Sequence, residues 1–158
     1  MKSVIVLSDT HGNERIINSL YEIMVETDYI VHLGDYSKDI KKIQQRFPQK
    51  VISVDGNCDL GDCVGKAFKV EGKTFFATHG HNFGVKSNLT RLMYFAEEKG
   101  FDVVLFGHTH IPCSEKSGDI LFVNPGTLEK KCKDKTYAYI VVNDNDCVCK
   151  IVNIKENF

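Results

Sequence analysis

Apolar, β-branched runs alternate with amphipathic segments along the first third of the chain, and this pattern predicts an α/β fold. Residues 3–7, 29–33 and 51–54 are expected to form strands. Between them, apolar residues recur at three- and four-residue spacing over 16–24 and over 37–47, which predicts two helices, the second ended by Pro48. Each strand runs into a short cluster that contains Gly, Asp, Asn or His.

The pattern changes after residue 60. Residues 67–70 and 73–78 flank Glu71-Gly72, a two-residue hairpin signal, so antiparallel pairing is expected beside the parallel strands. The remaining predicted elements are a helix over 88–99, strands over 102–106 and 120–123, and a final hairpin of 136–142 and 146–154. Because there is no repeat, low-complexity segment or linker, we expect a single domain over residues 1–158.

The composition is that of an ordinary globular protein. The chain has 158 residues, of which 42% are hydrophobic and 26% charged, which excludes disorder as a main theme. A net charge of -1 disfavours nucleic-acid polymers and anionic membranes as partners, because both are bound through counterion release by basic surfaces. With no signal peptide or membrane-length apolar run, a cytoplasmic location without a membrane partner is expected.

Six cysteines raise the question of a disulfide framework or a thiolate metal site. The chain is long enough to bury a core without disulfides, so reduced thiols are expected. No C-x2-C pair occurs, which argues against a zinc knuckle. Cys147 and Cys149 are better explained as two side chains on one face of a strand.

Side chains that can bind metals lie just beyond the ends of predicted strands. In open α/β sheets, the loops at the carboxyl ends of parallel strands converge on one crevice, so distant residues can meet there. The set contains carboxylate, amide and imidazole groups without thiolate, which suits manganese, iron or zinc. It exceeds the needs of one tetrahedral ion, so two divalent ions are expected. The seven residues are Asp9, His11, Asp35, Asn57, His79, His108 and His110.

Taken in order, the loops also carry a family resemblance. Five motifs resemble those of the calcineurin-like metallophosphoesterases: Asp9-Thr10-His11-Gly12, Gly34-Asp35, Gly56-Asn57-Cys58-Asp59, Thr78-His79-Gly80-His81 and Gly107-His108-Thr109-His110. The short length and the turn at 124–126 are similar to the small bacterial and archaeal phosphodiesterases of that superfamily. The resemblance spans essentially the whole chain. It implies a four-layer α/β/β/α sandwich with mixed sheets and a dinuclear metal site at the carboxyl edge.

The resemblance also implies a division of the ligands. One ion would take Asp9, His11, Asp35 and His110, and the other Asp35, Asn57, His79 and His108, with Asp35 bridging. The ions are expected to be Mn²⁺, with Ni²⁺, Fe²⁺ or Zn²⁺ as alternatives. The implied reaction is in-line attack of a metal-bridging hydroxide on a small phosphoester, with Asp35 and Asn57 in the catalytic machinery.

Cys58 departs from the family pattern. Many members have Gly-Asn-His at the third motif, where the histidine is thought to protonate the leaving oxygen or stabilise the transition state. A thiol with a pKa of about 8.5 stays protonated at neutral pH, so Cys58 could donate a proton, but it has no cationic state. We therefore expect a preference for diesters or for esters with good leaving groups. The alternative is that Cys58 only packs beside the site.

Two further side chains are candidates for substrate contact. Asn13 could approach the substrate or cap the following helix. His81 could meet the phosphate or make a local hydrogen bond. His32 falls inside a predicted strand and is expected to be structural.

Three alternatives to a small-molecule enzyme remain. The same fold serves as a non-catalytic, protein-binding scaffold in the retromer subunit Vps29, but the intact ligand set argues against a degenerate site. A nuclease or phosphoprotein phosphatase would need a long groove or extra domains.

A homodimer is expected to form, if at all, through exposed strand edges of the C-terminal hairpin.

Overall fold

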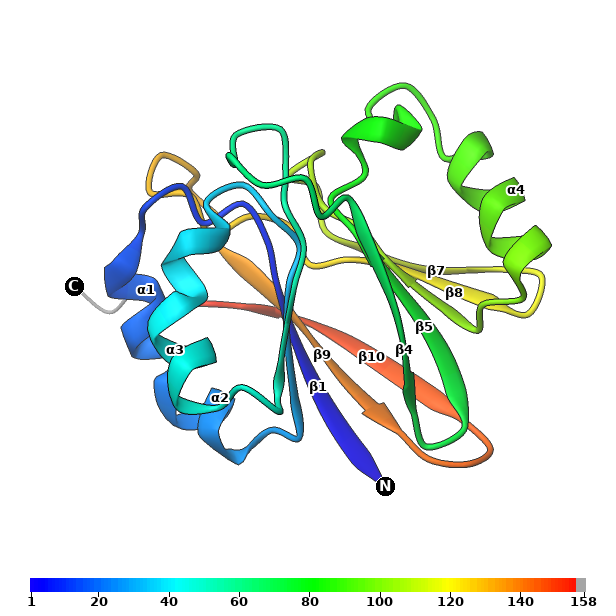
Figure 1. Cartoon of the computed structure of the whole chain (residues 1–158), viewed down its shortest axis with the longest axis horizontal. Helices are drawn as coiled ribbons and strands as arrows, with labels where there is room; N and C mark the ends of the chain where they lie inside the picture. Colours follow the sequence, from blue (N-terminus) through cyan, green and yellow to red (C-terminus); the bar gives the residue numbers. More distant parts are fainter. Residues whose placement is uncertain (156–158) are drawn as a thin grey trace.

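A computed structural model describes residues 1–155, so the last three positions of the predicted 1–158 domain lie outside the described residues. Two five-stranded sheets pack face to face (Figure 1). The first has the order β10 (Cys147–Asn153), β9 (Thr136–Val142), β1 (Lys2–Leu7), β2 (Tyr29–His32), β3 (Val51–Ser53). The second has the order β4 (Gly65–Val70), β5 (Lys73–Thr78), β6 (Val103–Leu105), β8 (Ile120–Asn124), β7 (Cys113–Ser117).

Both sheets are mixed, with a parallel part that determines where the loops gather. β1, β2 and β3 run parallel in the first sheet, and β5, β6 and β8 in the second. β9 and β10 are antiparallel additions to the first sheet, while β4 and β7 are the antiparallel edges of the second. The carboxyl ends of the parallel strands therefore come to one edge of the molecule, which is the upper edge in Figure 1.

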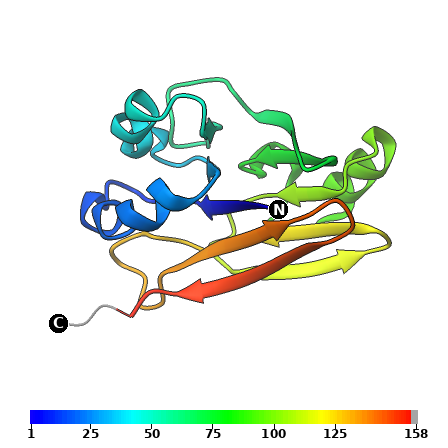
Figure 2. The ribbon, with the colours of Figure 1, turned by 90° about the horizontal axis from the view of Figure 1, so that it is seen from below.

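Helices cover the outer face of each sheet, which gives four layers. On the first sheet lie α1 (Glu14–Ser19), α2 (Tyr21–Glu26), the 3₁₀ helix η1 (Ser37–Ile40) and α3 (Lys41–Arg46). On the second lie the 3₁₀ helix η2 (His81–Phe83) and α4 (Thr90–Lys99). In Figure 2 the layers follow one another from the blue and cyan helices to the green α4. The predicted α/β/β/α sandwich with mixed sheets is confirmed.

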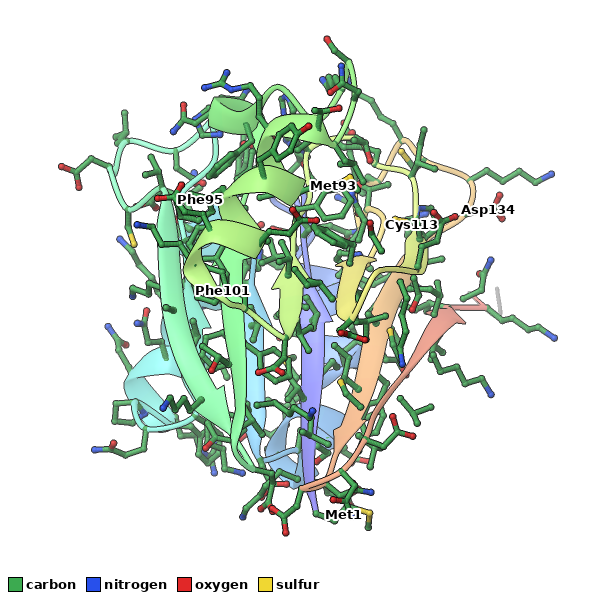
Figure 3. The ribbon with its side chains drawn as sticks, turned by 90° about the vertical axis from the view of Figure 1, so that its right-hand side faces the viewer. Met1, Met93, Phe95, Phe101, Cys113 and Asp134 are labelled. Atoms are coloured by element: carbon green, nitrogen blue, oxygen red, sulfur yellow. The ribbon has the colours of Figure 1, made fainter. Side chains whose placement is uncertain are left out.

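The alternation of side chains along each strand divides the core into three. Val4 and Val6 of β1 point into the core between the sheets, whereas Ile5 and Leu7 point toward the helices of the first sheet. The third core lies between the second sheet and α4, where the ring of Phe76 packs 5.0 Å from the rings of both Phe95 and Phe101. Figure 3 shows Phe95 and Phe101 on this covered side.

Three local predictions needed correction. The helix expected over 16–24 is two short helices that meet at Leu20, where a φ of -92° and a ψ of 1° depart from helical values. The segment expected as a helix over 37–47 starts as a 3₁₀ turn. Strand β7 was not predicted, since its sequence Cys-Ser-Glu-Lys-Ser is polar and largely exposed.

The described residues also bear on cysteine chemistry and on membranes. All six cysteines are free thiols. Within residues 1–155, no helix has the length and apolar composition that crossing a bilayer requires.

The core between the sheets offers a test of the packing. Leu105→Ala removes a fully buried side chain from β6 and is expected to lower the free energy of unfolding by about 2–5 kcal/mol. Leu60→Ala removes a fully exposed leucine and should change it by less than about 0.5 kcal/mol. Urea unfolding of both variants measures the difference, and equal effects would contradict the assigned burial.

Candidate metal centre

Loops from both sheets bring the seven predicted ligands into one cluster. Asp9 and His11 follow β1, Asp35 follows β2, and Asn57 follows β3. His79 follows β5, while His108 and His110 follow β6. Asp9, Asp35 and His79 are buried, whereas Asn57 is exposed and the remaining three histidines are partly exposed.

The first group of ligand atoms surrounds the Asp9 carboxylate. His110 Nε2 lies 3.0 Å from Asp9 Oδ1, and His11 Nε2 lies 3.9 Å from the same oxygen. His11 Nε2 is also 3.5 Å from Asp35 Oδ2. Ligand atoms of Asp9, His11, Asp35 and His110 all lie within 4.8 Å of one another, close enough to share one ion.

The second group is arranged around His79. Its Nε2 lies 3.4 Å from Asp35 Oδ1, 3.1 Å from His108 Nδ1 and 3.2 Å from Asn57 Oδ1. The Nδ1 atom of His79 is 2.8 Å from the Leu33 carbonyl, which can only accept, so Nδ1 carries the proton and the Nε2 lone pair faces the cluster. Asp35 thus presents one carboxylate oxygen to each group, Oδ2 to the first and Oδ1 to the second.

Left-handed backbone aims the ligands at the cluster. Six residues without the freedom of glycine have φ between 43° and 69° at these strand ends: Asp9, His11, Asp35, Tyr36, His108 and His110. Such a conformation costs an L-residue about 1–2 kcal/mol. Strain of this kind concentrates at functional sites, where the surrounding structure maintains it.

Two glycines leave room for the carboxylates. A Cβ at Gly56 would overlap the backbone nitrogen and carboxylate of Asp35. A Cβ at Gly107 would overlap the Ser8 hydroxyl and touch Asp9 Oδ2. The same close approach lets His108 N donate to Asp9 Oδ2 and Cys58 N donate to Asp35 Oδ1, which holds both carboxylates in place.

Charge in the cluster is unevenly distributed. Burial raises the pKa of Asp9, but contacts with His110, His79 and Ser8 outweigh burial and leave the pKa below its usual value. The same Asp9 contact raises the pKa of His110. Burial, with smaller contributions from His79 and Lys86, lowers the pKa of His108 to about 4, so this imidazole is neutral at pH 7. A neutral imidazole can offer its lone pair to a cation.

The donor set fits a divalent cation. Asp9 Oδ1 and His11 Nε2 are buried and lack a well-aligned hydrogen-bond partner among residues 1–155. A buried polar atom without a partner costs about 1–3 kcal/mol, and a cation between these two atoms would satisfy both. Carboxylate, amide and imidazole together are ligands for Mn²⁺, Fe²⁺ or Zn²⁺.

Cys58 lies at the open side of the cluster. The residue is exposed, and its thiol is 3.6 Å from the Asn57 side-chain nitrogen. Partial burial, followed by the negative charge of Asp35, raises the pKa of the Cys58 thiol. The thiol is therefore protonated at neutral pH and can act only as a neutral proton donor.

The two candidate substrate residues are placed differently. His81 lies beside the cluster, its ring 5.4 Å from that of His79, and its Nδ1 is buried without a partner among the described residues. Asn13 is only 3% exposed, and its amide donates to the Leu128 carbonyl. Asn13 occupies the N-cap position of α1, as the capping alternative predicted, but its side chain makes no capping hydrogen bond. Its inward bond joins the β1 loop to the segment after β8.

Structural contacts missed at the sequence level support the loops. The Tyr36 ring packs 5.3 Å from the His11 ring, and Glu129 Oε2 lies 3.7 Å from His110 Nδ1. His32 is fully buried, and its Nε2 is 3.2 Å from the Thr10 hydroxyl. No local pattern marks Tyr36 or Glu129, because their roles depend on residues distant in sequence.

Two pockets open on opposite sides of the cluster. One, of about 350 Å³, lies between η1 and the 55–61 loop and includes Tyr36, Lys38, Lys41 and Cys58 in its lining. The other, of about 470 Å³, lies between residues 85–89 and 106–113. In Figure 1 the segments that line the first pocket lie toward the left of the upper loop edge, and those that line the second lie to their right.

Comparison with known proteins agrees with this fold and cluster. Residues 1–146 match the calcineurin-like phosphoesterase superfamily domain. The chain is 33% identical to the probable metallophosphoesterase YsnB of Bacillus subtilis, over 91% of this chain and 86% of that protein. It is 30% identical to the phosphodiesterase YfcE of Escherichia coli, over 96% and 92% of the two chains. The structure of vacuolar protein sorting 29 from Cryptosporidium parvum shares the fold, with a TM-score of 0.82, 14% identity and coverage of 98% and 92%.

The chain therefore belongs to the calcineurin-like phosphoesterase superfamily, as the motifs predicted. The names of its relatives support a phosphoesterase of the hydrolase class, in a family that uses divalent metals, and this chain has candidate ligand groups for them.

The buried His32 behind the cluster predicts a pH dependence of stability. Burial lowers the pKa of His32 to about 4, below the value of about 6.5 in the unfolded chain. Between these values only the unfolded chain binds the proton. The free energy of unfolding therefore decreases as the pH is lowered from about 6.5 to about 4, by up to about 1.4 kcal/mol per pH unit. His32→Gln should remove this contribution. Urea unfolding of metal-free protein at pH 7 and pH 5 measures it, and an equal loss in both proteins would refute the assignment.

Proposed function

We propose that this chain is a divalent-metal-dependent phosphodiesterase that hydrolyses small phosphoesters at a dinuclear site, acting as one catalytic domain. The supporting observation is the sharing of Asp35 between two ligand groups, one oxygen directed to each. A shared carboxylate is the usual way to hold two ions about 3.5–4 Å apart. The cytoplasmic location and the homodimer stay predictions from the sequence.

In this proposal each group holds one ion. Asp9, His11, Asp35 and His110 hold the first, and Asp35, Asn57, His79 and His108 hold the second. We propose Mn²⁺ for both, with Ni²⁺, Fe²⁺ or Zn²⁺ as substitutes, since affinity also follows metal availability. The bond from His79 to the Leu33 carbonyl directs one ligand atom, and Glu129 beside His110 helps to orient another.

When bound, the ions supply an acidified water as nucleophile and neutralise charge on the phosphoryl oxygens, as in other two-metal hydrolases. The protein residues position the substrate around them. His81, whose ring lies 5.4 Å from that of His79, is a candidate for contact with the phosphoryl group. The protonated Cys58 thiol, at the open side, is available to the leaving oxygen.

The two pockets favour diesters over monoesters. A phosphodiester carries two ester arms that leave phosphorus in different directions, and one pocket lies on each side of the cluster. A monoester would leave one of them unused. One of the relatives is named a phosphodiesterase, which is consistent with this proposal.

Hydrolysis assays test the proposal directly. Metal-stripped protein is supplied with manganese, nickel, zinc or magnesium and assayed on bis-p-nitrophenyl phosphate and p-nitrophenyl phosphate. We expect metal-dependent cleavage that favours the diester. Asp35→Asn should reduce kcat/KM at least about 100-fold, because both groups lose a charged ligand. Asp62→Asn, an equal charge change at an exposed loop position, should retain the activity.

The role of Cys58 has its own test. Cys58→His introduces a group that can be cationic, so it should raise kcat on diesters with poor leaving groups, with little effect on p-nitrophenyl esters. Cys58→Ala distinguishes the two roles proposed for Cys58. We expect the substitution to lower kcat if the thiol donates a proton, and to leave kcat unchanged if the thiol only packs beside the site. No gain from the histidine, in protein with metals bound, would contradict the leaving-group role.

A protein-binding scaffold is the competing function. The likeness to vacuolar protein sorting 29 concerns the fold alone. The complete set of ligand-type side chains, held close together in two groups, favours the enzyme. A folded, metal-loaded and inactive protein in the assays above would instead favour the scaffold.

A further inference from the structure

The pocket of about 470 Å³ is an apolar groove beside the candidate metal centre. Its walls include Val85 and Leu89 on one side, and Phe106 and Ile111 on the other. Ile111 is 68% exposed and adds an accessible apolar side chain to this wall. Cys113, labelled in Figure 3, lies at the start of β7 and also lines the groove.

The groove lies next to the turn that carries two of the candidate ligands. Thr109 lines the groove and stands between His108 and His110 in the same turn. Val85 supports the other side, because it packs against Gly80, the residue that follows His79. An ester bound with its phosphorus over the cluster would therefore have one arm at the entrance to the groove.

Lys86 places a positive charge at this entrance. It lines the groove together with Thr109, the residue between His108 and His110. Lys86 is exposed, and within residues 1–155 no carboxylate lies within 4.0 Å of its ammonium group. A free cation beside an apolar wall is suited to an anion that carries an apolar substituent.

The pocket on the opposite side has a different chemistry. Lys38 and Lys41 are exposed there, and Lys38 Nζ lies 4.8 Å from the centre of the Tyr36 ring. Its carboxylates are already engaged, since Asp55 accepts from Ser37 and Cys63, and Asp59 accepts from the backbone of residues 37 and 56. That pocket is lined by four charged side chains, whereas Lys86 is the only one among the described residues of the groove, so an apolar arm would favour the groove.

We propose that the groove is the subsite for an apolar ester arm, aryl or alkyl, and that Lys86 contacts the phosphoryl charge next to it. The inference deepens the proposed phosphodiesterase function and rests on it. The expected substrate is then an asymmetric diester, which places its apolar arm against Ile111 and its polar arm in the opposite pocket.

The size of the groove favours a substrate arm over a protein partner. Seven residues line it, whereas a stable protein interface uses about 20–30 residues on each side. A volume of about 470 Å³ is in the range of small-molecule sites, about 300–1,000 Å³. The other large exposed apolar side chains include Leu60, in the opposite pocket, and Val148, on β10, so they do not extend the groove.

Binding of phosphonates tests the subsite without turnover, because their P–C bond is not hydrolysed. Calorimetry compares methyl-, butyl- and phenylphosphonate on manganese-loaded protein. Partial burial of the larger arms should make phenylphosphonate bind roughly tenfold more tightly than methylphosphonate. Ile111→Ser should bring that ratio below about two and leave the affinity for methylphosphonate unchanged.

Two further variants serve as controls. Val148→Ser removes a 61% exposed apolar side chain on β10 and should retain the tenfold ratio. Lys86→Gln should weaken all three phosphonates by a similar factor, about two- to fivefold, and preserve the ratio.

The outcomes separate this inference from the proposed function. A ratio near one in the unchanged protein, or an equal loss of the ratio in Ile111→Ser and Val148→Ser, overturns the apolar subsite even if the protein is active. A tenfold ratio that depends on Ile111 supports the subsite, and if the same protein hydrolyses no diester, only the proposed function fails.

Discussion

The candidate metal centre depends on the packing of one set of strand ends against another. Asp9, Asp35 and Asn57 come from the first sheet, whereas the histidines after β5 and β6 come from the second. The apolar core between the sheets brings these ends together, and two hydrogen bonds then align them: His108 N to Asp9 and His79 to the Leu33 carbonyl. The absence of a side chain at Gly107 leaves room for Ser8. Neither sheet alone could form the centre.

The left-handed backbone at these strand ends destabilises the folded state locally. Each of the six residues costs about 1–2 kcal/mol relative to a right-handed or extended conformation. The three apolar cores supply the stability that offsets this strain. In return the ligands are aimed before any ion or substrate arrives, which lowers the reorganisation that binding requires.

Sequence patterns that depend on local periodicity predicted most of the fold. The hairpin at Glu71-Gly72 followed from turn chemistry, and both residues have the positive φ that such turns need. The ligand set followed from strand ends that converge, although its metal roles are proposals. Strand β7 has no apolar alternation, so only the turn at Gly118 could have indicated it. The apolar groove joins residues 85–89 to residues 106–113, and no local pattern predicts such a surface.

Each ligand group contains residues of both sheets, and this arrangement links ion binding to the assembly of the fold. An ion in either group would be a bond across the layers that the unfolded chain cannot make. By mass action, its binding free energy would add to the free energy of sheet packing. The upper loop edge, where strain and unpaired polar atoms gather, would gain most. Local unfolding at that edge would then become rarer as the occupancy of the metal sites increases.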